Sequence, residues 1–237
     1  MKVLCVVVVV LSLASVCQPA SLACDLLLQP VEEGPDILGR WYLVAMSSDY
    51  CWVAALLNSL FVPSFQVDVT STEKLNYYDA NIKIKMYGVC DNKTIQYLYK
   101  TNMIAEVGTP DEIKKDPKGV ILHSRCQDCL VLRDNGLVSF LVILSRRPNI
   151  TAAEMKEFEV LADCLSLYRP QVMDTNHDYE NCSTPDNINP DSPEITEDLP
   201  KRMKKVFSEL FTCTTDKFLY YPRAAFRWAQ EMWDNLW

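Results

Sequence analysis

Ile37-Leu38-Gly39-Arg40-Trp41-Tyr42-Leu43-Val44-Ala45 has the pattern of a turn that leads into a β-strand. Gly39 permits backbone conformations that other residues avoid, and Trp41, two positions later, presents a large flat ring with one polar edge. An ordinary strand that begins after a glycine would have the same pattern. The stretch becomes informative only with the sequence that follows it, which favours a barrel closed over Trp41.

Several short runs after this stretch have the character of β-strands. Phe65–Thr70 alternates apolar and polar residues, as a half-buried strand does. Comparable runs are Leu75–Ala80, Ile82–Met86, Ile95–Tyr99, Met103–Val107, Gly119–His123, Leu130–Arg133 and Leu137–Arg146. With no helices between them, about eight such strands predict an antiparallel sandwich or barrel.

The connections between these runs also carry signals. Asp134-Asn135-Gly136, between two apolar runs, predicts a hairpin turn. Cys51–Leu60 is apolar and rich in alanine and leucine, which predicts a short helix or an ordered loop. Asp111–Lys118 is polar and flanked by prolines, so we expect an exposed loop there.

One amphipathic helix is predicted directly after the last strand. Thr151 and Glu154 have the spacing of a capping box, in which a hydroxyl and a carboxylate satisfy backbone donors reciprocally. One helical face then carries Met155, Phe158, Leu161, Ala162 and Leu165. This face must be buried, and the outer wall of a barrel is available for it.

The first 23 residues have the features of a secretory signal peptide. Lys2 precedes an apolar run from Val3 to Val16, and the small-residue site Ser21-Leu22-Ala23 follows. This run is shorter than the roughly 18 residues that a membrane span needs, and no other segment could cross a bilayer. Cleavage after Ala23 would leave 237 − 23 = 214 residues. We therefore expect a soluble, secreted, extracellular protein.

Removal of the signal peptide leaves an even number of cysteines, which in an oxidising compartment indicates disulfides. They are Cys24, Cys51, Cys90, Cys126, Cys129, Cys164, Cys182 and Cys213. Cys126 and Cys129 form a C-x-x-C motif, but a second such motif is missing and the only histidines are His123 and His177. A four-ligand zinc site is therefore not expected, and no cofactor or metal is predicted.

Three sequons for N-linked glycosylation begin at Asn92, Asn149 and Asn181. The net charge is −8 and becomes −9 when Lys2 leaves with the signal peptide. An acidic chain without a basic stripe is a poor candidate for binding nucleic acid.

The C-terminal part differs in composition from the rest. Residues 183–200 are rich in Pro, Asp, Glu and Asn, which predicts a linker. Residues 201–237 predict an amphipathic tail rich in aromatic residues. One apolar stripe holds Leu199, Met203, Val206, Phe207, Leu210 and Phe211, and a second holds Phe226, Ala229, Met232, Trp233, Leu236 and Trp237. These stripes either pack on the barrel or on each other, or they face a lipid surface or a second copy of the chain.

Two of these patterns together resemble the lipocalin family. Gly39-Arg40-Trp41 matches its first-strand G-x-W motif, and Leu144-Ser145-Arg146-Arg147-Pro148 with the helix that follows matches its last-strand arginine and outer helix. Ser124-Arg125-Cys126 departs from the T-D-Y motif expected in its place. The resemblance covers residues 24–182 and implies an all-β fold, an eight-stranded antiparallel up-and-down barrel with one α-helix outside, to which the helical tail is added.

The resemblance also implies specific contacts. In lipocalins the last-strand arginine lies across the tryptophan and closes the barrel floor through a cation–π contact, a position open to either Arg146 or Arg147 here. Within the family the sequence is similar to alpha-1-acid glycoprotein and to fish carriers of saxitoxin, tetrodotoxin or tributyltin, on the residues around Cys164 and Cys90. That similarity implies the disulfides Cys24–Cys164 and Cys90–Cys182. The partners of Cys51, Cys126, Cys129 and Cys213 stay open.

The expected function is carriage of a small hydrophobic or amphipathic ligand, with a toxin or xenobiotic as the finer hypothesis. An eight-stranded barrel has room for one small ligand inside. The lining predicted from strand alternation is Phe65, Val67, Val69, Tyr77, Ile84, Met86, Tyr97, Tyr99, Phe140 and Val142. Tyr77, Tyr78, Tyr97 and Tyr99 could offer hydroxyls to the ligand, or aromatic faces to a cation.

Two other classes of function compete with carriage: an enzyme and an interaction protein. A lipocalin-type prostaglandin isomerase needs a free thiol in the cavity, and the strand after Cys51–Leu60 carries no cysteine, so no enzyme activity is expected. The alternative is an interaction protein whose tail docks on lipoprotein, membrane or a second copy. Lys201, Arg202, Lys204 and Lys205 beside the apolar stripe would suit an anionic surface.

Overall fold

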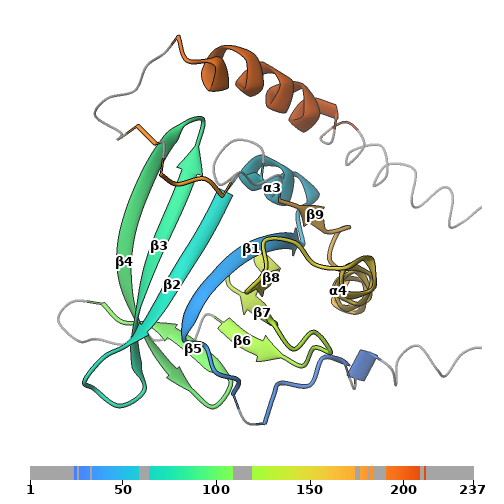
Figure 1. Ribbon diagram of the computed structural model, residues 1–237. Coiled ribbons are helices and arrows are strands. Elements are labelled where there is room, and N and C mark those ends of the chain that lie inside the picture. Colours follow the sequence, from blue (N-terminus) through green and yellow to red (C-terminus); the bar gives the residue numbers. More distant parts are fainter. Residues whose placement is uncertain are drawn as a thin grey trace, which may run out of the picture.

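The computed structural model describes residues 24–25, 27–32, 34–58, 64–108, 119–173, 177–180, 182–183, 191–208 and 211. Its centre is a β-barrel with helices outside it (Figure 1). The barrel strands are β1 (Gly39–Ser48), β2 (Ser64–Ser71), β3 (Tyr77–Met86), β4 (Val89–Lys100), β5 (Met103–Glu106), β6 (Gly119–Leu122), β7 (Cys129–Asn135) and β8 (Ser139–Ser145).

Antiparallel pairing runs from each strand to the next and then closes on itself. β8 pairs with β1, and the first half of β1 pairs with β2 from Gly39 opposite Val69 to Tyr42 opposite Gln66. The predicted up-and-down eight-stranded barrel is therefore confirmed. The runs Leu75–Ala80 and Ile82–Met86, predicted as two strands, belong to the single strand β3, because Asn81 continues the pairing with Thr94 of β4.

A short ninth strand, β9 (Gln171–Val172), was not predicted. It pairs with Ala45 and Met46 of β1. This second half of β1 lies beyond the pairing with β2, which ends at Tyr42. A two-residue strand carries too few residues for an alternating pattern, so the sequence offered no signal for it.

A bulge in β1 divides the apolar residues between the inside and the outside of the barrel. The register with β8 shifts between Leu43 and Ala45. Because a bulge changes which face a side chain points to, Leu43 and Met46 both join the interior cluster. Val44 and Ala45 join a second cluster on the outer wall.

The helix α4 (Ala152–Cys164) covers that outer cluster, as predicted. The capping box is present, since the Thr151 side chain accepts from the Glu154 amide and the Glu154 side chain accepts from the Thr151 amide. Phe158, Leu161 and Ala162 are buried against Val131, Leu141 and Ile143, among others, with Met155 and Leu165 packed at the edge. Full burial of side chains of this size stabilises a fold by about 1.5 to 3 kcal/mol each.

The predicted Cys51–Leu60 segment contains the helix α3 (Cys51–Leu56), which follows β1 at the end of the barrel opposite Gly39. The predicted turn at Asp134–Gly136 is displaced, because Asp134 and Asn135 end β7 and residues 136–138 connect it to β8. The Asp134 carboxylate accepts a hydrogen bond of 2.9 Å from the Gly136 amide. The predicted loop Asp111–Lys118 lies outside the described residues.

Three disulfides join described residues. Cys24–Cys164 and Cys90–Cys182, the two pairings that the resemblance implied, are both present. The third is Cys126–Cys129, which the sequence left open. Cys51 is also disulfide-bonded, whereas Cys213 lies outside the described residues.

A helix at the C-terminal end runs past the tip of the β3–β4 hairpin (Figure 1). We call residues 199–208 the tail helix; the π-helical turn η3 (Glu194–Asp198) precedes it. Helical backbone therefore begins inside the stretch assigned to a linker. Val206 is buried, but Met203, Phe207 and Phe211 are exposed. Leu210, the second apolar stripe and residues 1–23 lie outside the described residues.

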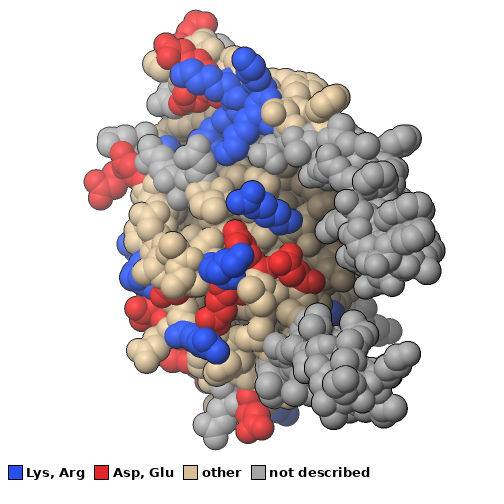
Figure 2. Space-filling view, turned by 90° about the vertical axis from the view of Figure 1, so that its right-hand side faces the viewer, with Lys and Arg blue, Asp and Glu red and all other residues tan. Residues whose placement is uncertain are grey.

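The charge on the face that carries the tail helix is mixed (Figure 2). Acidic and basic side chains alternate over most of it, and basic side chains gather near its top, at the height of the tail helix. Within the described part of the chain, no helix has the length and apolar character needed to cross a membrane.

Candidate ligand-binding site

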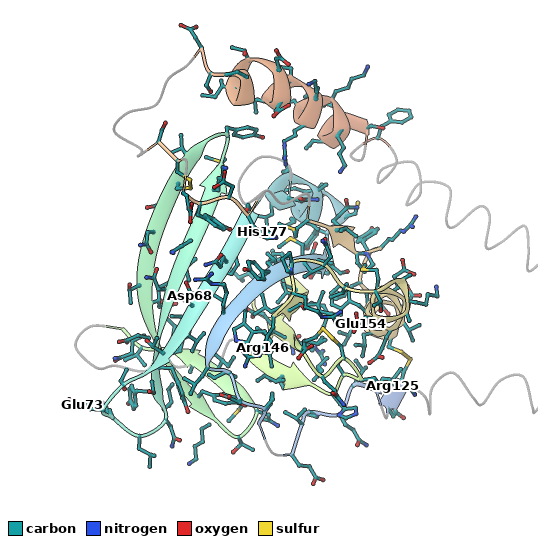
Figure 3. All side chains as sticks on the ribbon, in the orientation of Figure 1. Asp68, Glu73, Arg125, Arg146, Glu154 and His177 are labelled. Carbon is teal, nitrogen blue, oxygen red and sulfur yellow. A yellow bond between two sulfur atoms is a disulfide. The ribbon has the colours of Figure 1, made fainter. Side chains whose placement is uncertain are left out.

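The floor of the barrel is built on Trp41. Its ring is buried, and its indole N–H donates to the carbonyl oxygen of Ile37 over 2.8 Å. The Arg146 guanidinium carbon lies 4.2 Å from the centre of the ring, and Arg146 also donates to the carbonyl of Asp36 (Figure 3). A cation–π contact of this kind is worth about 0.5 to 2 kcal/mol.

Gly39 makes room for this arginine. Its φ is +91°, a conformation that side chains disfavour, and a Cβ there would lie 2.9 Å from an Arg146 guanidinium nitrogen. The backbone turn therefore favours glycine at this position, and a Cβ would in addition crowd the cation that covers Trp41.

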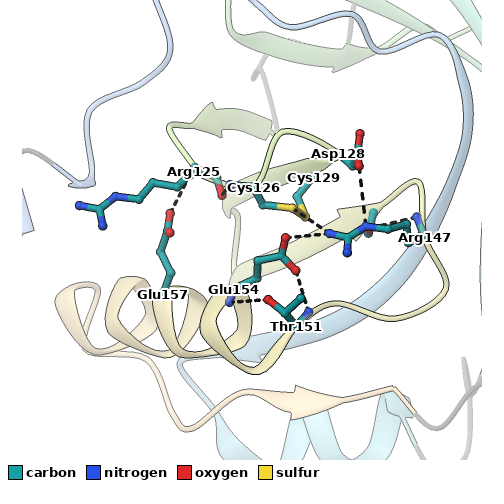
Figure 4. The surroundings of a disulfide bond; sticks show 10 residues. Arg125, Cys126, Asp128, Cys129, Arg147, Thr151, Glu154 and Glu157 are labelled. Carbon is teal, nitrogen blue, oxygen red and sulfur yellow. Dashed lines mark hydrogen bonds and ion pairs between the residues drawn. A yellow bond between two sulfur atoms is a disulfide. The ribbon is translucent and has the colours of Figure 1, made fainter.

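Arg147, the other arginine considered for the floor, points toward Glu154 of α4 (Figure 4). It forms an ion pair of 2.7 Å with Glu154 in the first turn of α4, and a longer one with Asp128. It also donates to the sulfur of Cys126 over 3.7 Å. Arg147 therefore ties α4 to the loop that the Cys126–Cys129 disulfide closes.

The chain just before β1, around Val31 and Pro35, crosses under the floor and closes it. The Tyr99 hydroxyl donates to the carbonyl of Pro35, and the Asn102 amide donates to the carbonyl of Val31. Gly34 allows this close approach, because a Cβ there would lie 1.9 Å from the Tyr99 hydroxyl oxygen. Burial, with Tyr78 and Asp36 nearby, raises the pKa of Tyr99 to about 12, so this hydroxyl stays a neutral donor.

Above the floor lies an apolar cavity of about 200 Å3, which we call the deep cavity. It is lined by residues that point inward from seven strands and by one residue of the N-terminal segment. These are Ile37, Trp41, Phe65, Val67, Val69, Tyr78, Ala80, Ile82, Tyr97, Ile104, Leu130, Leu132 and Leu144.

A second cavity of about 370 Å3, the mouth cavity, lies at the opposite end of the strands from the floor. It is lined by Met46, Leu57, Tyr97, Ile104, Glu106, Gly119, Leu132, Asp134, Phe140 and Val142. Tyr97, Ile104 and Leu132 line both cavities, so the two are contiguous. The whole space runs from Trp41 at the bottom to two carboxylates, Glu106 and Asp134, at the top.

Six of the ten predicted lining residues lie on these cavities. They are Phe65, Val67, Val69, Tyr97, Phe140 and Val142. The continuous apolar run of β8 had no readable alternation; in the structure Val142 and Leu144 face inward, while Leu141 and Ile143 face α4.

The other four predicted residues lie elsewhere, for three different reasons. Tyr77 lies one position from Tyr78, which lines the deep cavity, and alternation puts the two on opposite faces; Lys74 covers the Tyr77 ring instead. Ile84 and Met86 have the inward parity, but they follow Ile82, the last residue of β3 that lines a cavity. Tyr99 belongs to the core of the floor.

The sequence interpretation missed most of the middle of the lining and both carboxylates. Ala80 and Ile82 share the parity of Ile84, so the same alternation would have found them. Tyr78, expected to offer a hydroxyl or an aromatic face, also lines the deep cavity. Glu106 and Asp134 carried no signal of their own, because charged residues at strand ends are ordinarily solvated.

Glu106 affects the ionisation of the Tyr97 hydroxyl, which belongs to the residue opposite it. Burial and the negative charge of Glu106 both raise the pKa of the Tyr97 hydroxyl above its usual value, so this phenol stays neutral. Each carboxylate stands opposite an aromatic residue on the neighbouring strand, Glu106 opposite Tyr97 and Asp134 opposite Phe140.

Among the described residues, the cysteines and one cluster of possible metal ligands are engaged in other contacts. Each cysteine in the described ranges is disulfide-bonded. Cys126, Cys129 and Glu154 place possible metal ligands within 4.8 Å of one another. The two sulfurs are bonded to each other, and the Arg147 cation lies beside both Glu154 and Cys126, so this group does not suit a metal ion.

Two of the three sequons can be located. Asn92 is exposed on β4, and Asn149 is exposed just before α4. Asn181 lies outside the described residues.

The fold and the site together define the class of protein. An eight-stranded up-and-down barrel with a Trp–Arg floor, one apolar cavity open at the other end and a single helix on its outer wall is a lipocalin. More narrowly, the chain belongs to the ApoM domain family, whose model matches residues 3–186. No curated protein matches the sequence.

One solved structure supports the fold. The solution structure of lipocalin 12 from rat epididymis has a TM-score of 0.52 at 10% identity, over 66% of this chain and 95% of that one. The siderocalin Ex-FABP has a TM-score of 0.45 at 12% identity, over 60% of this chain and 95% of that one. At such identities the first likeness shows the fold alone.

Proposed function

We propose that the protein is a secreted glycoprotein that binds and carries a small hydrophobic or amphipathic ligand inside the barrel. The observation that carries this proposal is the apolar space between Trp41 and the mouth. Ligand sites are typically apolar clefts of about 300 to 1,000 Å3 with a few polar groups that set orientation. Burial of apolar ligand surface there contributes about 25 cal/mol per Å2.

Family membership favours a carrier over an enzyme. The prostaglandin isomerase alternative requires a free thiol in the cavity, and the residues that line both cavities include no cysteine. We therefore propose that the protein is not an enzyme.

Secretion and glycosylation belong to the same proposal. The signal-like residues 1–23, the three disulfides and the exposed sequons at Asn92 and Asn149 support it. Mass spectrometry of the protein secreted by transfected cells should find Cys24 at its N-terminus and glycans on both asparagines.

The finer hypothesis is that the ligand is a toxin or xenobiotic. It is supported by the similarity of the residues around Cys90 and Cys164 to alpha-1-acid glycoprotein and the fish toxin carriers. The family match is to the ApoM domain, so this hypothesis depends on those local similarities and on binding data.

An interaction protein acting through its tail is not favoured. The family match ends at residue 186, before the tail helix begins. One apolar residue of the tail helix, Val206, is already buried within the chain.

The carrier proposal is tested by titrating the oxidised protein with an apolar fluorescent dye. We expect saturable one-to-one uptake, displaced selectively by one class in a panel of fatty acids, retinoids, steroids, organotins and guanidinium toxins. Ala80→Phe, which places a ring in the deep cavity, should weaken uptake at least tenfold.

Thr70→Phe is the matched control, because Thr70 is exposed on β2, next to the inward-facing Val69. This variant should bind the dye as the wild-type protein does. Absence of uptake by the wild-type protein, or equal losses in the two variants, would contradict carriage in this cavity.

A further inference from the structure

Tyr97 brings a hydroxyl group into the apolar interior of the barrel. It lines both the deep cavity and the mouth cavity, as Ile104 and Leu132 do, so it lies where the two spaces meet. Burial is the larger of the two effects that raise the pKa of its hydroxyl. The phenol end of this side chain is therefore largely removed from bulk water.

This hydroxyl forms no hydrogen bond to any residue that the structure describes. Polar groups near the floor are satisfied, because the Trp41 indole N–H donates to Ile37. The Tyr99 hydroxyl likewise donates to Pro35. A hydrocarbon ligand that excludes water leaves the Tyr97 hydroxyl without a hydrogen bond, which opposes binding. A ligand oxygen that accepts from this hydroxyl removes the penalty.

A second phenol lies on the neighbouring strand. Tyr78 stands opposite Tyr97 in the pairing of β3 with β4, and it also lines the deep cavity. Its ring meets the Tyr99 ring edge-on, with 6.0 Å between the ring centres. Within the described ranges its hydroxyl also forms no hydrogen bond. Two adjacent strands therefore each offer one phenol to the same space.

The deep cavity offers neutral donors only. Among the described residues that line it there is no Lys, Arg, His, Asp or Glu. Burial of an ionised ligand group without an opposite charge costs far more than burial of a neutral group that forms a hydrogen bond. The two phenols thus favour an uncharged oxygen over a carboxylate or a phosphate in this cavity.

We propose that the barrel selects apolar ligands that carry a neutral oxygen, as a carbonyl or a hydroxyl group, on the part buried in the deep cavity. The Tyr97 hydroxyl donates to this oxygen and determines the specificity, and Tyr78 supplies a second donor. This inference rests on the proposed carrier function and names its ligand class. The apolar remainder of the ligand packs against the aliphatic lining of the cavity.

The test uses two probes with one carbon skeleton, 1-indanone and indane, which differ only by a carbonyl group in place of a methylene group. Their size is suitable, because an engineered apolar cavity of about 150 Å3 binds benzene and the deep cavity measures about 200 Å3. Each probe displaces the apolar dye from the full-length, oxidised protein at pH 7. Comparing variants with the wild-type protein for each probe separately cancels the difference in hydrophobicity between the probes.

Tyr97→Phe keeps the ring and removes only the hydroxyl. This variant should weaken binding of 1-indanone by about three- to tenfold, the effect of one neutral hydrogen bond, and should not weaken binding of indane. Tyr78→Phe tests the second donor in the same way. Tyr77→Phe is the matched control, because it removes a hydroxyl from the opposite face of β3 and should change neither probe.

The outcomes separate this inference from the proposed function. Equal weakening of both probes by Tyr97→Phe, unchanged binding of 1-indanone in this variant, or a barrel that takes up the dye but neither probe overturns the oxygen selection and leaves the carrier intact. Failure of the dye to bind to the wild-type protein overturns the carrier function, and the inference with it.

Discussion

Arg40 and Asp68 connect the two strands that close the barrel. They stand opposite each other on β1 and β2, and the guanidinium contacts both carboxylate oxygens, at 2.7 and 3.3 Å. Partial burial opposes ionisation of Asp68. The hydrogen bond and charge of Arg40, helped by Gln66 and Lys83, outweigh it and lower the pKa of Asp68 below its usual value.

This lowered pKa predicts a dependence of stability on pH. The contribution of Asp68 is fully present above its unfolded pKa of about 3.9 and is lost as the pH falls through its lower folded pKa. Asp68→Asn should therefore lower the free energy of unfolding by about 0.5 to 1 kcal/mol at pH 6 and by almost nothing near pH 2.

Urea unfolding of both proteins between pH 2 and pH 7 measures this difference. Subtracting the free energies of unfolding of the two proteins at each pH removes the contributions that both share. One of these is the contribution of His177, whose pKa is lowered by burial. A difference that stays constant with pH would show that Asp68 acts through packing and not through its charge.

At the scale of elements, α4 depends on the partly buried Glu154 in two ways. Its carboxylate accepts from the Thr151 amide over 2.7 Å and forms the ion pair with Arg147. The backbone hydrogen bond, with Arg147, lowers the pKa of Glu154 despite some loss of solvation. One residue thus caps the helix and fastens it to the loop of Cys126 and Cys129.

Glu154→Ala should destabilise the protein by about 1 to 2 kcal/mol, since it removes both the capping contact and the ion pair. The amides of the first turn of α4 should exchange hydrogen faster than in the wild-type protein. Glu159→Ala is the control, because among the described residues Glu159 forms its ion pair with exposed Lys156, and it should cost at most about 0.5 kcal/mol. Equal effects of the two variants would contradict this role of Glu154.

For the whole molecule, the three disulfides that join described residues fall into two kinds. Cys24–Cys164 and Cys90–Cys182 join residues separated by 140 and 92 positions, whereas Cys126–Cys129 closes a separation of 3. The loss of chain entropy in the unfolded state grows with the length of the closed loop. The first two therefore fasten distant segments to the barrel, and the third shapes one turn.

Removing Cys90 and Cys182 together, as serines, should lower the free energy of unfolding by about 4 kcal/mol. Removing Cys126 and Cys129 in the same way should cost about 2 kcal/mol or less. Urea unfolding of both double variants under oxidising conditions checks the order. A larger loss of stability in the variant without Cys126–Cys129 would contradict this order. It would mean that the contacts of this short loop with Arg147 and α4 stabilise the protein more than the loss of chain entropy in the unfolded state does.

Much of the architecture followed from local patterns. Alternation located the strand segments, although two predicted runs form the single strand β3, and the Thr151–Glu154 spacing placed α4. The floor was implied by the lipocalin resemblance that Gly39 and Trp41 carry. These signals are readable because each depends on residues close in sequence. Strand alternation also found six lining residues, although a single position separates Tyr77, which faces away, from Tyr78, which faces in.

By itself the sequence determined the strand segments, an antiparallel sandwich or barrel and the outer helix, because hydrophobic period, capping and turn chemistry act over a few residues. The eight-stranded barrel and its Trp41 floor were implied by the resemblance to lipocalins. Only the tertiary structure decided which arginine covers Trp41, how the bulge in β1 divides Leu43 from Val44, and that Glu106 and Asp134 face one cavity. Those features depend on strand register and on closure of the barrel, which bring together side chains far apart in the sequence.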